Sequence, residues 1–390
     1  MKKILFLSSQ IPSPPDSGGK VKSYHLLKHM CSEYKVGLIC GEKEGEDLGE
    51  LKDWKMEFCM SFPNERPRTK INFLKSWMIA PSLNTFRNSS KEIQKAVNEK
   101  LDWADVLLVD HLEMMQFVPK NCKAKVVLHE HNAEHMLWQR KSEISSFPMS
   151  MVLELEAQRV KRFELASCER SAQVWAAPAD QEVLSNAGIP KEKLFTTFHL
   201  GAEDLLDRNE IKFEGKNARI LFFGTLSWDP NLEGLVWFLR EIWPPLKARH
   251  AELELDICGK GASSVFVSLL KRMDGVNYHG FVDDLEPFFQ NSRLSIAPLN
   301  YGSGMKIKVV ESLYRGLPCV TTQIGAESLD PVMDALSIAE DSEKFRREVE
   351  YLIEDFSLAE KKADLGRKLS REHLSWTAHW KDLKGYLSEL

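Results

Sequence analysis

The chain has 390 residues, 43% of them hydrophobic and 28% charged, which is the composition of a folded protein with enough apolar material for two domain cores. A formal net charge of −5 excludes a general attraction to nucleic acid. The seven cysteines include no Cys-x-x-Cys pair, so we expect reduced structural thiols. No apolar run reaches the roughly 20 residues that a membrane-spanning helix needs.

The first half alternates β-rich runs with helical patterns, which predicts a parallel sheet. The run at 4–7 is followed at once by prolines, so we interpret it as a buried strand and not as a signal peptide. A helical pattern over 20–30 follows it, and further strands are expected at 36–40, 106–109, 125–128 and 174–177.

A polar stretch over 202–217 marks the expected domain boundary. Strands are then predicted at 219–224, 253–258, 276–279, 295–297 and 318–321, so the second half repeats the pattern of the first. Three helices are expected at the end of the chain, the last one with Trp376, Trp380 and Leu383 on one apolar face. The fold class predicted is α/β, with two doubly wound Rossmann-like domains.

Glycine-rich turns after strands are where open α/β sheets bind phosphate groups. The first turn, Asp16–Lys20, contains Gly18 and Gly19 before a helix. The second contains Gly224 and continues through Asn231, where Ser227, Asp229 and Asn231 suit helix capping as well as ligand binding. A third turn surrounds Gly259 and is a weaker indication. None matches Gly-x-Gly-x-x-Gly or a Walker loop, which disfavours dehydrogenases and P-loop kinases.

The fourth turn carries the strongest indication of function. Gly302 and Gly304 precede a helix expected from about Met305 to Arg315, with Lys306 and Lys308 at its start. Lysines at a helix N-terminus oppose the helix dipole unless an anion is bound, so we expect a diphosphate there. The alternative is a solvated ion-pair ladder of Lys308, Glu311 and Arg315.

Histidines cluster at His129, His131 and His135, where a predicted strand ends. His131 and His135 have the i, i+4 spacing of a zinc pair, but the rest of a zinc motif is missing, so no metal is expected. A histidine there suits hydrogen bonding to a substrate hydroxyl, and Arg140 follows for charge recognition.

A basic and aromatic segment stands out in this acidic protein. Arg66, Arg68, Lys70, Lys75 and Arg87 alternate with apolar residues of the 71–79 stretch. This pattern suits an anionic membrane surface or a lipid-linked acceptor, and equally a core element flanked by solvated charge.

The chain resembles the retaining GT-B glycosyltransferases of family 4 over nearly its whole length. The stretches that carry the resemblance are Pro14–Gly19, His131–Glu134, Phe223–Gly224 with Pro230–Asn231, Gly280–Val282 and Gly304–Pro318. The resemblance implies a GT-B fold whose two domains face a central cleft. It implies an acceptor-binding domain over 1–200, a nucleotide-sugar-binding domain over 201–374 and a helix over 375–390 that crosses back to the first domain.

The resemblance also implies site residues. Catalytic roles fall to His131, beside the donor sugar, and to Lys306, on the leaving diphosphate. Glu311 matches the glutamate that holds the ribose, whereas Ser303 stands where the family usually has a sugar-facing glutamate. The basic residue usual beyond the Gly224 turn is also absent. Lys20 and Arg140 are expected to contact the acceptor, and the remaining donor contacts are assigned to Gly18, Gly19, Gly224, Phe281, Ser303, Gly304, Met305, Lys306 and Lys308.

The sequence thus predicts a metal-independent glycosyltransferase, without a cofactor, that transfers a sugar with retention from a nucleotide sugar, UDP-linked in preference to GDP-linked. The acceptor is expected to be a saccharide or lipid-linked glycan in cell-surface or exopolysaccharide synthesis. The expected location is cytoplasmic, with peripheral contact at the inner membrane surface. Two alternatives stay open, a nucleotide-sugar epimerase and a catalytically silent GT-B partner in polysaccharide assembly, the latter supported by Ser303.

Overall fold

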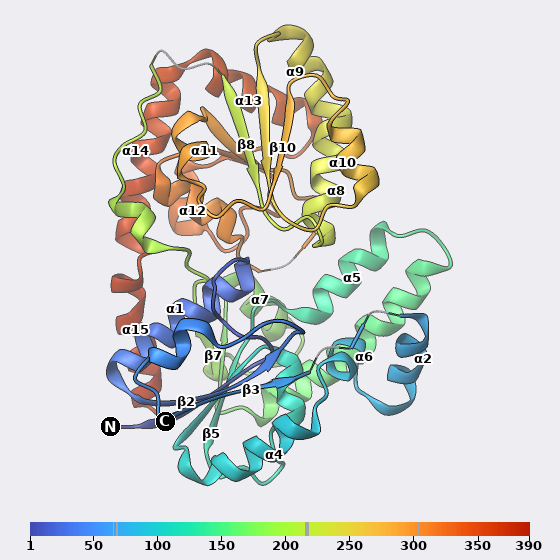
Figure 1. Ribbon diagram of the computed structural model, residues 1–390, viewed down its shortest axis with the longest axis vertical. Helices are drawn as coiled ribbons and strands as arrows, with labels where there is room; N and C mark the ends of the chain where they lie inside the picture. The colour runs from blue at the N-terminus through green and yellow to red at the C-terminus, as the bar shows by residue number, and fades with distance from the viewer. Residues whose placement is uncertain (65, 68, 215–217, 303) are drawn as a thin grey trace. The chain divides into compact units, whose positions relative to one another are not determined.

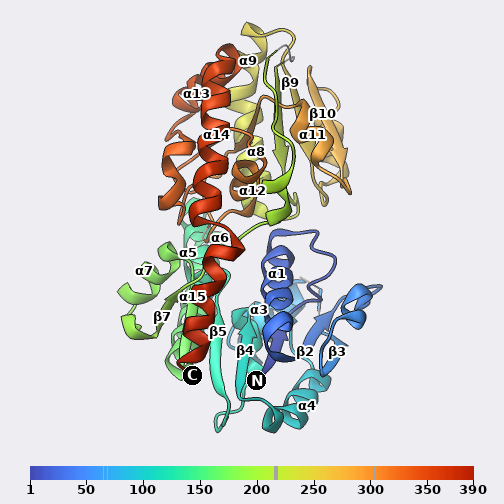
Figure 2. The same ribbon diagram turned by 90° about the vertical axis from the view of Figure 1, so that its left-hand side faces the viewer.

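The computed structural model describes every residue except 65, 68, 215–217 and 303. The chain divides into two compact units, residues 1–199 with 380–390, and residues 200–379. Each unit is a parallel sheet with helices on both faces (Figures 1 and 2).

The first unit contains a seven-stranded sheet in the order β3-β2-β1-β4-β5-β6-β7, with all neighbours parallel. Its strands are β1 (Lys3–Ser8), β2 (Lys35–Glu42), β3 (Phe58–Pro63), β4 (Val106–Asp110), β5 (Lys125–His129), β6 (Gln173–Ala176) and β7 (Leu194–Thr196). Its helices are α1 (Gly18–Glu33), α2 (Lys70–Ile79), α3 (Leu83–Arg87), α4 (Lys91–Lys100), α5 (Glu134–Ile144), α6 (Met149–Arg170) and α7 (Pro178–Asn186).

The second unit contains a six-stranded parallel sheet in the order β10-β9-β8-β11-β12-β13. Its strands are β8 (Arg219–Phe223), β9 (Glu254–Cys258), β10 (Val276–Gly280), β11 (Leu294–Ala297), β12 (Cys319–Thr321) and β13 (Ser337–Ile338). Its helices are α8 (Asp229–Trp237), α9 (Trp243–Arg249), α10 (Ser264–Leu270), α11 (Glu286–Asn291), α12 (Ile307–Arg315), α13 (Ser342–Glu354) and α14 (Phe356–His373).

The last helix, α15 (Trp376–Ser388), begins in the second unit, and its residues from Trp380 onward belong to the first. The Trp380 indole donates a hydrogen bond to Glu33 at 2.8 Å, and Lys384 forms an ion pair with the same carboxylate at 2.6 Å. Among the described residues, no helix is both long and apolar enough to cross a membrane.

Both sheets have a switch point, where the strand order reverses and where open α/β sheets bind ligands at the carboxyl ends of the strands. In the first sheet the switch lies between β1 and β4, and in the second between β8 and β11. Fully buried strand residues such as Phe6 and Phe222 anchor these central strands in their cores. The fold therefore gives two strand-end regions in which a site is expected.

The turns that follow β8 and β9 are packed backbone to backbone. The Gly224 N–H donates to the Cys258 carbonyl at 3.0 Å, and a Cβ added to Gly259 would lie 2.0 Å from the Gly224 carbonyl oxygen. Only glycine fits at position 259 without moving the backbone of its neighbour.

We therefore expect Gly259→Ala to lower the free energy of unfolding by about 1–3 kcal/mol through steric strain. Gly385→Ala in α15 is the matched control, because nothing lies within 4 Å of its added Cβ. That change should raise stability by about 0.5–1 kcal/mol. Urea unfolding of both variants checks this, and equal stabilities would contradict the packing described.

Candidate functional site

The glycine-rich loop of the second unit leads into α12, which begins at Ile307 and not at Met305 as expected from the sequence. Gly304 has a φ of 70° and Lys306 has an extended backbone at the N-cap, so the helical conformation starts two residues later. Lys306 is consequently the N-cap residue, and Lys308 is the lysine in the first turn. Ser303 lies outside the described residues.

Lys308 reaches across to the turn that follows β8. Its amine donates a hydrogen bond to the side-chain carbonyl of Asn231 and lies 4.8 Å from the centre of the Phe222 ring. A Cβ at Gly224 would be 3.1 Å from the same amine. The structure thus brings Lys308 and Gly224 together (Figure 1 shows α12 and β8), with Asn231 between them.

The positive charge of the Lys308 amine is poorly compensated by its surroundings. Although its side chain is only partly buried, loss of hydrating water and, to a smaller extent, the charge of nearby Lys306 lower its pKa to about 7. Among the residues that the structure describes, no carboxylate lies within ion-pair distance of this amine. An anion bound here would restore the charged form.

Lys306 is buried and already has protein partners. Its amine donates to the Gly304 carbonyl and lies 3.5 Å from the Glu327 carboxylate. The lysine therefore holds the shape of the glycine loop as well as adding charge beside it. Met305 is buried in the same loop.

Glu311 faces a different part of the chain from the two lysines. Its carboxylate is 3.5 Å from the Ala202 N–H, and a Cβ on Gly201 would be 2.6 Å from its Cγ. Burial raises the pKa of Glu311 to about 7, despite the Ala202 hydrogen bond that lowers it.

The ion-pair ladder considered for α12 is wrong. Lys308 bonds to Asn231, Glu311 accepts from Ala202, and the fully buried Arg315 pairs with Glu286 through two hydrogen bonds of 2.7 and 2.8 Å. The three side chains therefore serve separate contacts.

Capping does not account for the polar residues of the Gly224 turn. The N-cap of α8 is Trp228, which makes no side-chain cap bond, while the Asn231 amide donates to the Thr225 carbonyl at 2.9 Å. Phe281, beyond the end of β10, is half-exposed, with the Lys260 amine 5.6 Å from its ring centre. Phe281 and Gly224 thus follow β10 and β8, which end at the same edge of the sheet with β9 between them.

A buried histidine and carboxylate cluster occupies the switch point of the first unit. Asp110, at the end of β4, accepts hydrogen bonds of 2.8 Å from His129 and His131 on one oxygen. The hydroxyls of Ser8 and Ser23 donate to its other oxygen at 3.0 and 2.6 Å. Burial opposes ionisation of Asp110, but the surrounding histidines outweigh it and hold its pKa well below 3.8.

His111 completes this cluster by stacking on His131, with ring centres 3.7 Å apart. Burial opposes its protonation, but Asp110 outweighs burial and raises the pKa of His111 to about 9. Burial and the His111 charge keep the pKa of His131 well below 6.5. His131 is therefore a neutral ring beside a cationic one.

Three atoms of this cluster, on Asp110, His129 and His131, lie within 4.8 Å of one another and have the chemistry of metal ligands. Their 2.8 Å contacts fit hydrogen bonds. His135, the zinc partner considered for His131, instead bonds to Glu164. The donor set is thus arranged as a proton-sharing network.

Helix α1 begins at Gly18, two residues earlier than the sequence predicted, so Gly18 and Gly19 lie in the first turn of the helix and not before it. A Cβ on Gly19 would lie 3.9 Å from the His111 ring, and Lys22 donates to the His131 carbonyl at 3.3 Å. The turn and the histidine cluster are therefore neighbours. This places Gly19 and His131 in one region of the first unit.

The two residues assigned to the acceptor lie in different surroundings. Lys20 is buried and paired with Glu46 at 3.0 Å and with Asp16 at 3.7 Å, so its charge is already neutralised. Arg140 is partly exposed on α5. The contacts of Lys20 therefore do not require a ligand.

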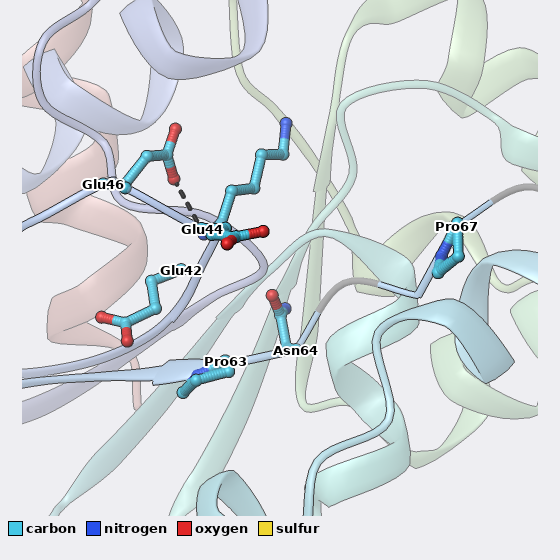
Figure 3. Close-up of a pocket in the computed structure, with 8 residues that line it drawn as sticks. Glu42, Glu44, Glu46, Pro63, Asn64 and Pro67 are labelled. Atoms are coloured by element: carbon cyan, nitrogen blue, oxygen red, sulfur yellow. Dashed lines mark hydrogen bonds between the residues drawn. The ribbon is translucent and has the colours of Figure 1, made fainter.

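A cavity of about 510 Å³ opens beside the Lys20 partner Glu46, where β2 and β3 end (Figure 3). It is lined by three glutamates, Glu42, Glu44 and Glu46, and by one lysine, Lys43, so its charged side chains are acidic on balance, and Asn64 faces it from the other side. Its charge suits a neutral or cationic molecule and opposes a phosphate.

Comparison with known proteins places part of the chain in a known family. The family described as glycosyl transferases group 1 matches residues 217–355, most of the second unit. The protein carries a glycosyl transferases group 1 domain. The family predicted from the sequence is confirmed for residues 217–355.

Relatives and solved structures extend this comparison. An uncharacterized 44.6 kDa protein in the cps region of Klebsiella pneumoniae is 27% identical over 123 residues, which cover 30% of this chain and 32% of the relative. The match thus spans about a third of the relative's length. Anabaena HepE in complex with UDP and glucose is similar over 100% of both chains, with 15% identity and a TM-score of 0.72.

WaaG, a glycosyltransferase involved in lipopolysaccharide biosynthesis, is similar over 97% of this chain and 98% of its own, with 13% identity and a TM-score of 0.67. These similarities show the GT-B fold, as the sequence predicted.

Sequence reasoning missed several residues of the two strand-end regions. Asp110, the centre of the histidine cluster, directly follows the strand predicted at 106–109. An aspartate at the end of a strand was the signal that could have identified it. Gly201 and Glu327 are far from α12 in sequence, and no local pattern connects them to Glu311 and Lys306.

Asp110→Asn tests the histidine cluster. Because the folded pKa of His111 is about 9 against 6.5, its stabilising contribution is complete below pH 6.5 and is lost as the pH rises through 9. Wild type should lose about 2–3 kcal/mol of unfolding free energy between pH 6 and pH 9.5 that the variant does not lose. Urea unfolding at both pH values measures this, with the exposed Asp102→Asn as control. Parallel pH profiles for wild type and Asp110→Asn would refute the assignment.

Proposed function

We propose that the protein is a retaining glycosyltransferase that transfers a sugar from a UDP-sugar to a saccharide or lipid-linked glycan during cell-surface polysaccharide synthesis. The observation that carries this proposal is the uncompensated Lys308 amine between Gly224 and the start of α12. The UDP and glucose bound by HepE and the cps-region relative support the donor and the pathway class.

In this proposal Lys308 binds the diphosphate, and Lys306 adds charge while it shapes the loop. Backbone groups of Gly224, Gly304 and Met305 complete the phosphate contacts at the helix N-terminus. Lys308 also supplies the positive charge that the Gly224 turn itself lacks. The lysines make a metal ion unnecessary for leaving-group stabilisation.

Glu311 accepts hydrogen bonds from the ribose hydroxyls, which replace the water that its partly buried carboxylate has lost. Phe281 lies beside the base, and His131 with the Gly18–Gly19 turn lies beside the sugar and phosphates. Ser303 is assigned to the sugar by its place in the loop. Lys20 and Arg140 remain proposed acceptor contacts, with Lys20 acting through Glu46 at the acidic cavity.

The acceptor oxygen attacks the anomeric carbon on the same face from which the diphosphate departs, so the configuration of that carbon is retained. The nucleoside diphosphate leaves with the electron pair of the broken bond, and its oxygen takes up the proton of the acceptor hydroxyl. Positive charge at Lys306 and Lys308 stabilises the negative charge that develops on the leaving group. A cytoplasmic location belongs to this proposal, and seven free thiols accord with a reducing compartment.

Lys308→Met should weaken UDP-sugar binding by about 10- to 100-fold, because a charge-assisted hydrogen bond contributes about 1.5–3 kcal/mol. Calorimetry with UDP-glucose, together with its slow hydrolysis, measures the effect. The exposed Lys271→Met, in the same unit, should bind like wild type. Equal affinities of wild type and Lys308→Met for UDP-glucose would contradict the assignment of the diphosphate to this lysine.

Donor binding should take up a proton at pH 8. Lys308 is mostly neutral there because its pKa is about 7, and a bound diphosphate raises that pKa. The binding enthalpy at pH 8 should therefore depend on the ionisation enthalpy of the buffer, and this dependence should shrink at pH 6. Lys308→Met should abolish the uptake at pH 8, and uptake that persists in the variant contradicts the proposal.

Product analysis separates transfer from the two alternatives. A glycosyltransferase releases UDP rapidly only when an acceptor is present, and the sugar appears on that acceptor. An epimerase converts the donor with no acceptor, and a silent partner leaves it unchanged. Either of these last two results would overturn the proposed function.

A further inference from the structure

We propose that the first unit docks on an anionic lipid bilayer through the α2–α6 surface, defined as the exposed apolar side chains within residues 71–79 and 144–155. These two short segments hold most of the large hydrophobic side chains exposed on the first unit. Met78 is 84% exposed, Phe147 79% and Ile79 72%. The proposal does not depend on sugar transfer.

Helix α2 is apolar but contributes almost nothing to the core. Its only buried residue is Ser76, whereas Ile71, Leu74 and Met78 are exposed. An apolar helix that a protein core used would bury those side chains and expose the serine. The apolar residues of α2 therefore face outward.

The two segments form one surface, because Arg159, which follows the second segment on α6, contacts the first segment. Its guanidinium donates to the Ser76 and Ala80 carbonyls at 2.7 and 2.8 Å and lies 4.9 Å from the centre of the Trp77 ring. Leu155 is exposed one helical turn before Arg159. Figure 1 shows α2 beside α6, with α5 and α6 forming a hairpin whose connection carries Phe147.

The balance of basic and acidic residues around this surface indicates the kind of partner that it binds. Residues 66–87 contain five basic residues and no acidic one, and the 144–155 segment adds a single charged residue, Glu154, although the whole protein has a net charge of −5. Lys70 and Lys75 are exposed on α2 among its apolar side chains. Exposed apolar side chains beside lysines, with a tryptophan among them, are the side chains that bind at the interface of an anionic bilayer.

A second copy of the chain fits this surface less well. Two copies meeting there would bring two unbalanced basic segments together, which costs free energy. A bilayer with anionic headgroups instead neutralises the lysines while it buries the apolar side chains. The observations therefore favour lipid.

Vesicle sedimentation tests the inference. The full chain should bind vesicles of equal parts phosphatidylglycerol and phosphatidylcholine, and bind pure phosphatidylcholine at least about 5-fold less, because each lysine near an anionic surface contributes about 1 kcal/mol. The double variant Met78→Asp, Ile79→Asp and the single variant Phe147→Asp should each lose most of the bound fraction. The control is Val265→Asp, Leu269→Asp on α10, whose side chains are also exposed, and it should bind like wild type.

UDP-glucose affinity measured in solution distinguishes this inference from the proposed function, because the patch variants should keep it. Size-exclusion chromatography shows whether the wild type is a dimer that the patch variants dissociate. That result, an absence of vesicle binding by wild type, or patch variants that bind like wild type would each overturn the inference. Lys70→Glu, Lys75→Glu should lose binding to the anionic vesicles and so support it.

Discussion

The central constraint in the second unit is the amine of Lys308, which lacks a carboxylate partner among the described residues. It sits in the first turn of α12, where the helix dipole is already positive. Such an arrangement lowers the stability of the unliganded protein and is compensated when a dianionic ligand binds. The glycine loop, Asn231 and Lys306 are arranged around this amine and hold it in place.

The parallel sheets explain why the site residues gather. Every strand of a sheet ends at the same edge, so residues distant in sequence meet where the strand order reverses. In the second unit this brings the Gly224 turn to Lys308, and in the first it brings Asp110 to His129 and His131. The two units differ in their electrostatics, since the first surrounds the Asp110 carboxylate with histidines and hydroxyls, whereas the second contains a lysine amine with no carboxylate partner among the described residues.

Local pattern was enough to predict the alternating architecture, the glycine turns and the lysines, because each depends on neighbours in sequence. It placed the start of α12 two residues early, because the backbone of Gly304 and Lys306 is set by the loop and not by helix propensity. It could not predict that Glu311 faces Gly201, or that Arg315 pairs with Glu286, because these are tertiary contacts. The basic 66–87 segment was visible in the sequence, but its α6 neighbour was not.

The most direct test compares the affinities of uridine, UMP and UDP by calorimetry in EDTA, for wild type and Lys308→Met. If Lys308 binds the diphosphate, wild type should bind UDP at least about 10-fold more tightly than uridine, with UMP between them, and Lys308→Met should reduce that difference sharply. An equal preference for UDP over uridine in both proteins, or no preference in wild type, would contradict the account.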